Sequence, residues 1–183
     1  MSTTLSRPTA GTWTIDNSHS SLDFKVRHLM AAKVKGRFAE FSGDIIIDPQ
    51  IEKSSVNVEI KIDSIDTHNQ DRDTHLKAGD FFDTEQFPTA TYKSTNIVQK
   101  NQNEFLVEGE LTIKGITKKV DLETEFNGVV QDPWGNSKAV FSATGSINRE
   151  DFGLTWNQTL ETGGVLIGKN IQLEIELEAT YQQ

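Results

Sequence analysis

The sequence predicts an all-β fold, a single eight-stranded antiparallel up-and-down β-barrel. Apolar residues recur at every second position through most of the chain, which is typical of strands with one buried and one solvated face. Turn-forming residues separate the alternating segments, and no linker, repeat or low-complexity run divides the chain. Several segments exceed the usual length of about five or six residues, which suits the tilted strands of a barrel.

The expected strands each have one dry face. In the sixth strand, Val120, Leu122, Phe126 and Val130 form this apolar face, and acidic residues occupy positions between them. The eight strands are expected at residues 12–27, 34–48, 55–64, 88–97, 104–114, 117–130, 137–149 and 169–181. A closed barrel of this size is either filled by its own side chains or holds one small ligand.

The connections are expected to alternate between the two ends of the barrel. Tight turns are marked by DPQ (48–50), KNQN (100–103), KGIT (114–117) and DPWGN (132–136). The first, third, fifth and seventh connections are residues 28–33, 65–87, 115–116 and 150–168. These four must share one end of an up-and-down barrel, so the long connections are expected at a single rim.

A short helical segment is expected between the third and fourth strands. Asp66 or Thr67 is a suitable N-cap, and residues 69–77 can form two helical turns.

One face of this helix carries a cluster of ionisable residues. His68, Asp71, Arg72 and His75 follow spacings of three and four residues, which place them on one face. Two neutral imidazoles and a carboxylate could hold zinc. Arg72 favours a structural network instead, because it would pair with Asp71 or Asp73 and would disfavour a bound dication. We expect this network and no metal; contact with a ligand head group is the third interpretation.

Two further motifs indicate structure rather than chemistry. GGVLIGKN at 163–170 is similar to a P-loop, but Asn170 replaces the magnesium-binding Ser or Thr, and a strand follows where a helix is needed. His19 and His28 show no triad spacing, and DNSHSSLDF has no surrounding nucleophile elbow. We expect neither nucleotide binding nor catalytic residues.

Composition limits the partners and the compartment. The chain has 183 residues and a formal net charge of −9, which disfavours nucleic acid and anionic membrane surfaces, because these need clustered Lys and Arg. The absence of cysteine excludes disulfides and Cys-ligated zinc. No segment is apolar enough to span a bilayer, and MSTTLSRPTAGTW has no signal-peptide core, so we expect a cytoplasmic protein. Residues 1–11 are expected to be a flexible extension, and residues 12–183 the barrel domain.

Long stretches of the chain resemble the YceI family of lipocalin-like bacterial proteins. They are WTIDNSHSSLDFKVRHL (13–29), GRFAEFSGDI (36–45), SSVNVEIKIDSIDT (54–67), RDTHLKAGDFFDTEQFPTATYKST (72–95), GELTIKGITKKVDL (109–122), DPWG (132–135) and INREDFGLTWNQTLETGGVLIG (147–168). The resemblance implies an extended lipocalin-like barrel around an apolar tunnel that binds polyisoprenoids, isoprenoid quinones or fatty-acid-like amphiphiles. It also implies that homodimers occur, and it supplies no catalytic residues.

We therefore expect a non-catalytic protein that binds, transports or stores a long apolar lipid in its barrel, without a cofactor. The expected tunnel wall consists of Phe24, Val26, Val58, Ile60, Leu111, Leu122, Phe126 and Phe141. The expected rim consists of His28, Arg72, His75, Phe81, Phe82, Phe152 and Trp156. Two alternatives stay open: a metal-dependent enzyme that uses His68, Asp71 and His75, and a filled barrel that acts as an interaction module.

Overall fold

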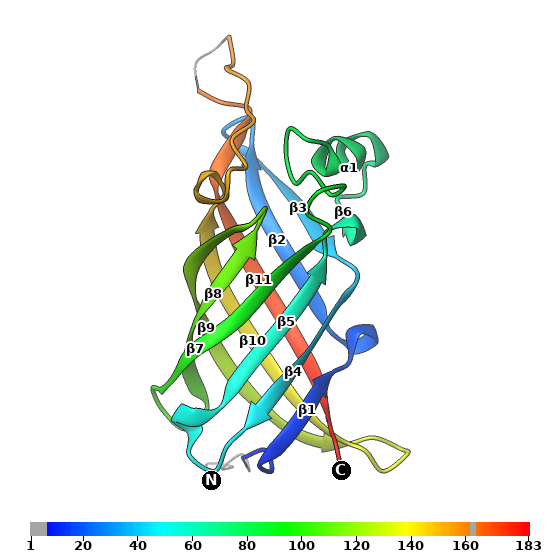
Figure 1. Ribbon diagram of the computed structural model, residues 1–183, viewed down its shortest axis with the longest axis vertical. Coiled ribbons are helices and arrows are strands. Elements are labelled where there is room, and N and C mark those ends of the chain that lie inside the picture. Colours follow the sequence, from blue (N-terminus) through cyan, green and yellow to red (C-terminus); the bar gives the residue numbers. More distant parts are fainter. Residues whose placement is uncertain (1–6, 162–163) are drawn as a thin grey trace.

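The computed structural model describes residues 7–161 and 164–183, which form one closed β-barrel (Figure 1). Its strands are β1 (Gly11–Ile15), β2 (Ser21–His28), β3 (Ala32–Phe38), β4 (Phe41–Ile47), β5 (Ser55–Lys61), β6 (Ile65–Asp66), β7 (Thr89–Gln99), β8 (Glu104–Ile113), β9 (Ile116–Gln131), β10 (Ser137–Asn148) and β11 (Ile167–Tyr181). Its helical elements are α1 (Gln70–Lys77) and the short 3-10 helices η1 (Asn17–His19), η2 (Ile51–Lys53), η3 (Ile62–Ser64) and η4 (Arg149–Phe152).

Three of the barrel strands are each built from two shorter elements placed end to end. β1 and β2 both pair with β11. β4 pairs with β1 and β3 pairs with β2, and on their other side β5 pairs with β4 and β6 pairs with β3. The elements in the described ranges therefore make the closed, eight-stranded antiparallel barrel that the alternation predicts.

The capped 3-10 turn η1 separates β1 from β2 in the first barrel strand. The Asp16 carboxylate caps η1 by accepting a hydrogen bond from the backbone N–H of Ser18 at 3.1 Å. β11 runs past the interruption and pairs with the segments on both sides of it. The predicted strand 12–27 is thus one barrel strand with a local break.

The helix lies between β6 and β7, not directly after the predicted third strand. η3 and the two-residue strand β6 intervene, and β6 pairs with β3. The helix also begins later than predicted, because its N-cap is Asn69 and not Asp66 or Thr67; the Asn69 side chain accepts a hydrogen bond from the Arg72 backbone N–H at 2.9 Å. Neither α1 nor any other helix in the described ranges is long and apolar enough to cross a membrane.

The elaborate connections lie together at one end of the barrel, which we call the α1 end (Figure 1). It carries the β2–β3 turn, the connection that contains α1, the β8–β9 turn and the described parts of the long segment between η4 and β11. The C-terminus, the start of β1 and the shorter connections lie at the opposite end, which we call the terminal end (Figure 1). This is the arrangement that the up-and-down topology predicts.

A β-bulge in β9 changes which residues face the interior. The register with β10 shifts, so that Phe141 pairs with Phe126 while Val140 pairs with Gly128. One extra residue moves the following side chains to the opposite face of the sheet. Val130, which the alternation places inside, is 55% exposed, and the prediction for this residue is wrong.

The expected N-terminal extension lies partly outside the described residues, which begin at Arg7. The last residue of the expected extension, Gly11, already belongs to β1. The backbone carbonyl of Thr9 accepts a 2.9 Å hydrogen bond from the indole N–H of Trp13, whose side chain is buried. The described end of this segment is therefore attached to the barrel.

Candidate functional site

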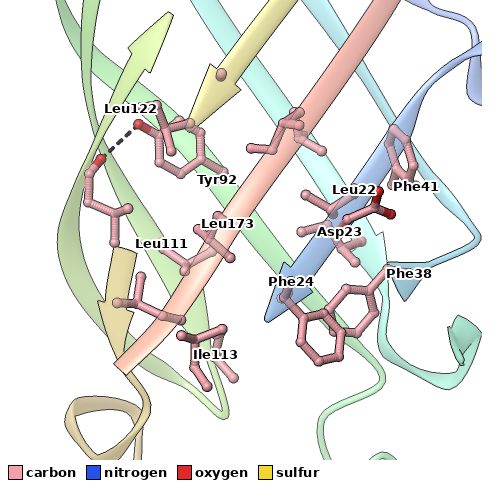
Figure 2. A pocket seen from close by; sticks show the side chains of 18 of the residues that line it. Leu22, Asp23, Phe24, Phe38, Phe41, Tyr92, Leu111, Ile113, Leu122 and Leu173 are labelled. Atoms are coloured by element: carbon pink, nitrogen blue, oxygen red, sulfur yellow. Dashed lines mark hydrogen bonds between the residues drawn. The ribbon is translucent and has the colours of Figure 1, made fainter. Parts of the chain in front are cut away.

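An apolar cavity of about 560 Å³ occupies the barrel. Its lining extends from Arg7 and Ile51 at the terminal end to His75 and Trp156 at the α1 end. Figure 2 shows one part of it, where Phe24 of β2 and Phe38 of β3 lie side by side with ring centroids 5.6 Å apart. The volume is within the range of about 300–1,000 Å³ that is usual for small-molecule sites.

All eight residues of the expected tunnel wall line this cavity. They are Phe24, Val26, Val58, Ile60, Leu111, Leu122, Phe126 and Phe141. Many further wall residues were not singled out from the sequence, among them Leu22, Val34, Phe38, Tyr92, Ala143 and Leu173. Several of them belong to the same alternating patterns, so the alternation of apolar and polar residues could have placed them on the inner face as well.

Three aromatic rings meet at the α1 end of the cavity. The ring centroid of Trp156 lies 4.8 Å from that of His75 and 5.4 Å from that of Phe81, and the His75 and Phe81 centroids are 5.1 Å apart. Trp156 comes from the long segment before β11, whereas His75 and Phe81 come from α1 and the residues after it. The two longest connections therefore pack against each other at this end.

Six of the seven expected rim residues line the cavity, namely His28, Arg72, His75, Phe81, Phe82 and Trp156. Phe152 does not line it. Its side chain is 1% exposed and belongs to the hydrophobic core, because the turn η4 ends at Phe152 and directs the ring inward. The placement of Phe152 at the rim is therefore corrected.

The polar segment before α1 is organised around Thr67. The Arg72 guanidinium donates hydrogen bonds to the Thr67 hydroxyl at 2.8 Å and to the Thr67 carbonyl at 2.6 Å. The Asp73 carboxylate accepts hydrogen bonds from the backbone N–H and the hydroxyl of the same residue. Arg72 thus pairs with Thr67, which is 3% exposed, and not with Asp71 or Asp73 as the sequence suggested.

The proposed metal ligands do not come together. His68 precedes the helix cap, has a φ of 60°, and its side chain is 81% exposed. Asp71 and His75 line the cavity, but His68 does not. Within the described ranges, these three side chains form no group whose ligand atoms lie within 4.8 Å of one another. The later start of the helix is the physical cause, because it leaves His68 off the helical face.

Arg149 is a buried cation at the α1 end that the sequence did not single out. Its side chain lines the cavity, and the residue is only 3% exposed. Its guanidinium donates hydrogen bonds to the backbone carbonyls of Leu154, Trp156, Ile167 and Gly168. Burial lowers its pKa from the ordinary value, although a guanidinium stays protonated. One side chain therefore joins the first part of the long segment, at Leu154 and Trp156, to the start of β11.

A second acid–base cluster lies outside the cavity, next to η1. Asp16, His19 and Glu178 place their ligand atoms within 4.8 Å of one another, but the Lys138 ammonium lies 3.1 Å from Asp16 and 4.0 Å from Glu178. Hydrogen bonds from Ser18, His19 and Lys138, with that from Ser18 the largest, hold the pKa of Asp16 well below its usual range. The cluster is an ion-pair network with its own cation.

This cluster is not a catalytic triad. The Ser18 hydroxyl and the Asp16 carboxylate both contact the same ring nitrogen of His19, at 3.2 Å and 2.8 Å. A triad needs the nucleophile and the carboxylate on different nitrogens of the imidazole. The structure therefore agrees with the expectation that DNSHSSLDF is a structural motif.

The P-loop-like segment is also structural where it is described. Gly163, its first residue, lies outside the described residues. Ile167–Tyr181 is a strand, and Lys169 within it forms a 3.5 Å ion pair with Glu150. The helix that a P-loop requires is replaced by β11.

Comparisons with known proteins agree with this architecture. Residues 13–179 match the protein family that is described as "YceI-like domain". A UPF0312 protein of Staphylococcus aureus strain MSSA476 is 44% identical over 170 residues, which cover 91% of this chain and 95% of that protein. The crystal structure of the Campylobacter jejuni YceI protein has a TM-score of 0.73 and 34% identity, covering 87% of this chain and 91% of that one.

A polyisoprenoid-binding domain from Saccharophagus degradans has the same fold. Its structure superimposes with a TM-score of 0.72 over 93% of this chain and 98% of that one, at 14% sequence identity.

Proposed function

The chain belongs to the YceI family, and we propose that it binds a lipid with a long apolar tail inside its barrel without catalysing a reaction. Polyisoprenoids and isoprenoid quinones are the preferred ligand class. The single observation that carries the proposal is the apolar cavity of about 560 Å³ that extends between the two ends of the barrel. The shared fold with a polyisoprenoid-binding domain supports it.

The energetic basis is the removal of the lipid tail from water. Burial contributes about 0.8 kcal/mol per methylene group, so each five-carbon isoprene unit can contribute several kcal/mol. In this proposal the wall consists of Phe24, Val26, Val58, Ile60, Leu111, Leu122, Phe126 and Phe141. Such a wall provides few polar groups, so the length and width of the cavity select the tail.

The polar end of the ligand is proposed to lie at the α1 end. His28, Arg72, His75, Phe81, Phe82 and Trp156 would form the rim there. Arg72 and His75 provide the polar groups, and the rings of Phe81 and Trp156 cover the adjoining apolar surface. A role in transport or storage follows from a site that holds a lipid without changing it.

The two alternatives have less support. The separation of His68 from Asp71 and His75 argues against a metal-dependent enzyme. The cavity argues against a barrel filled by its own side chains. The cytoplasmic location and the homodimer stay predictions from the sequence.

The decisive experiment is solvent extraction of the purified protein followed by mass spectrometry. We expect a lipid with an apolar tail at near-stoichiometric amount. As a control, protein unfolded and refolded without lipid should yield none and should then bind farnesol and longer prenyl alcohols. Protein that carries no lipid and binds no prenyl alcohol would overturn the proposal.

A further inference from the structure

The hairpin formed by β2 and β3 presents a basic outer surface on an acidic protein. Phe24, Val26 and Val34 point into the barrel and line the cavity, so strand alternation places the residues between them on the outer face; the exposed Arg27 also borders the cavity. The outward basic residues are Lys25, Arg27, Lys33, Lys35 and Arg37. They are five of the 18 basic residues of a chain with a net charge of −9.

The pairing of the two strands places like charges opposite each other. Lys25 lies directly across from Lys35, and Arg27 lies directly across from Lys33. Like charges at such positions oppose strand pairing. Two cross-strand pairs of this kind, side by side, are therefore not explained by the stability of the hairpin.

Few carboxylates compensate this charge. Lys25 pairs with Glu174 at 2.6 Å, and Arg37 pairs with Asp66 at 3.5 Å. Arg27, Lys33 and Lys35 have no carboxylate within 4.0 Å among residues 7–161 and 164–183. The hydrogen bond from Lys25, and more weakly the charges of Lys35 and Lys33, lower the pKa of Glu174.

The turn of the same hairpin exposes two large apolar side chains, which we call the hairpin tip. Leu29 is 50% exposed and Met30 is 52% exposed. Both have positive φ angles, 54° and 66°, a conformation that Asn or Gly adopts more easily than Leu or Met. Neither solubility nor backbone geometry favours these residue types in this turn.

The hairpin tip lies next to the cavity. His28, immediately before it, lines the cavity, and so does Leu166, whose carbonyl accepts a 2.9 Å hydrogen bond from the Leu29 backbone N–H. The turn belongs to the α1 end, at the top of Figure 1. A surface that contacts Leu29 and Met30 therefore also meets the rim.

We propose that the β2–β3 hairpin docks this protein onto lipid bilayers that contain anionic lipids. Leu29 and Met30 enter the boundary between head groups and acyl chains, while Arg27, Lys33 and Lys35 lie against the anionic head groups. The acidic remainder of the chain is repelled by the same surface, which turns the basic face of the hairpin toward the bilayer. Membrane docking is a function additional to lipid binding in the cavity, because it concerns the outer surface with which the protein contacts a bilayer.

The local charge of the hairpin is opposite in sign to the net charge of the chain. The net charge of −9 disfavours an anionic membrane surface when it is averaged over the chain. The hairpin instead places five cations and one carboxylate, that of Asp23, on one face, beside two exposed apolar side chains. The local charge, within a Debye length of about 8–10 Å, decides the interaction with a surface.

Vesicle co-sedimentation tests the proposal directly. The whole protein is mixed with phosphatidylcholine vesicles, with and without phosphatidylglycerol, at low and high salt. We expect binding only to the anionic vesicles, and loss of binding at high salt. The K33E/K35E variant should lower the partition coefficient by about tenfold or more, since each basic residue near the surface contributes about 1 kcal/mol.

Two further variants separate the parts of the surface. L29N/M30N removes the apolar tip, and Asn tolerates the positive φ; it should also weaken vesicle binding. K53E/K93E makes the same change in net charge at exposed residues of η2 and β7, and it should bind like the parent protein. Melting curves verify that each variant folds, and farnesol binding in solution verifies that the cavity is unchanged. That second measurement separates a failure of docking from a failure of lipid binding.

Three results would overturn the proposal. The first is equal binding to neutral and anionic vesicles, and the second is equal loss of binding in K53E/K93E. The third is a protein that binds double-stranded DNA tightly and whose L29N/M30N variant binds both DNA and vesicles as the parent does. That result would mean that the basic face binds polyanions in general and that the apolar tip has no role.

Discussion

The ring of Tyr92 on β7 lies over Gly109 of β8 inside the barrel, so that a Cβ atom at position 109 would overlap the Tyr92 phenol ring and its oxygen. The glycine creates the room in which the Tyr92 hydroxyl donates a 2.8 Å hydrogen bond to the Val120 carbonyl (Figure 2). Burial raises the pKa of Tyr92 above its ordinary value, so the group stays a neutral donor. A polar side chain is thereby accommodated in an apolar wall.

We expect Gly109→Ala to destabilise the protein by about 1–3 kcal/mol, because the new methyl group displaces a packed ring. The melting temperature should fall by roughly 2–4 °C for each kcal/mol. Gly79→Ala is the control, since no atom lies within 4 Å of a Cβ at that position. The penalty for Gly109→Ala should shrink in a Tyr92→Leu background; an equal penalty in both backgrounds would contradict the contact.

Ala143 and Ala139 give a matched test of where the barrel is hollow. Both lie on β10 and are buried, but only Ala143 lines the cavity. Ala143→Leu should occupy ligand space and barely change the stability of the ligand-free protein. Each displaced methylene group of the ligand costs about 0.8 kcal/mol, so displacement of two should weaken prenyl-alcohol binding roughly tenfold.

Ala139→Leu is the counterpart of that variant, because Ala139 is 0% exposed and packed on all sides. It should lower stability by about 1–3 kcal/mol through overpacking. Titration with farnesol and melting curves of both proteins give the answer. Destabilisation by Ala143→Leu with unchanged binding would mean that the barrel is filled at that level.

Arg149 should be essential to the long connection at the α1 end. Arg149→Met removes the guanidinium donors for the carbonyls of Leu154, Trp156 and Gly168, and a buried carbonyl left unpaired costs about 1–3 kcal/mol. The Ile167 carbonyl loses one donor but keeps the hydrogen bond from the Asn157 side chain. Arg149→Lys should be intermediate, because an ammonium cannot reproduce the fork of a guanidinium.

Urea unfolding and limited proteolysis measure this effect. Arg149→Met should make the segment between η4 and β11 more sensitive to protease than the rest of the chain. A parent-like stability and protease resistance of Arg149→Met would show that the four hydrogen bonds are dispensable.

Asp16 should make the protein more sensitive to acid. Its folded-state pKa lies below the unfolded value of 3.8 because of Ser18, His19 and Lys138. A depressed carboxyl pKa contributes stability above the unfolded value, and that contribution is lost as the pH falls further. Asp16→Asn should therefore cost about 1 kcal/mol near neutral pH, and this difference should shrink as the pH falls below the unfolded value of 3.8.

Urea unfolding at several pH values tests this prediction. Asp63→Asn is the control, since Asp63 makes no ion pair within 4.0 Å in the described ranges. A difference between Asp16→Asn and the parent protein that stays constant down to pH 2 would contradict the role of the ionised carboxylate.

The period of two determined the strands, the closed barrel and its inner face. Phe24, Val58 and Leu111 could be placed on the cavity wall because a side chain in a strand faces one side or the other. The alternation of connections between two ends also required no tertiary information, since it follows from strand order alone. It placed His75 and Trp156, far apart in the sequence, at the same end.

The tertiary structure decided the features that depend on which of several side chains makes a hydrogen bond, or on the register in which two strands pair. Asn69, and not Asp66 or Thr67, caps the helix. His68 therefore lies before the helix and does not share a face with His75. The bulge that exposes Val130 depends on the pairing of β9 with β10, and no local pattern reports it. Lys25 and Lys35 meet because two strands pair in one register. Local periodicity fixes which way a side chain points, whereas contacts between distant segments fix what it meets.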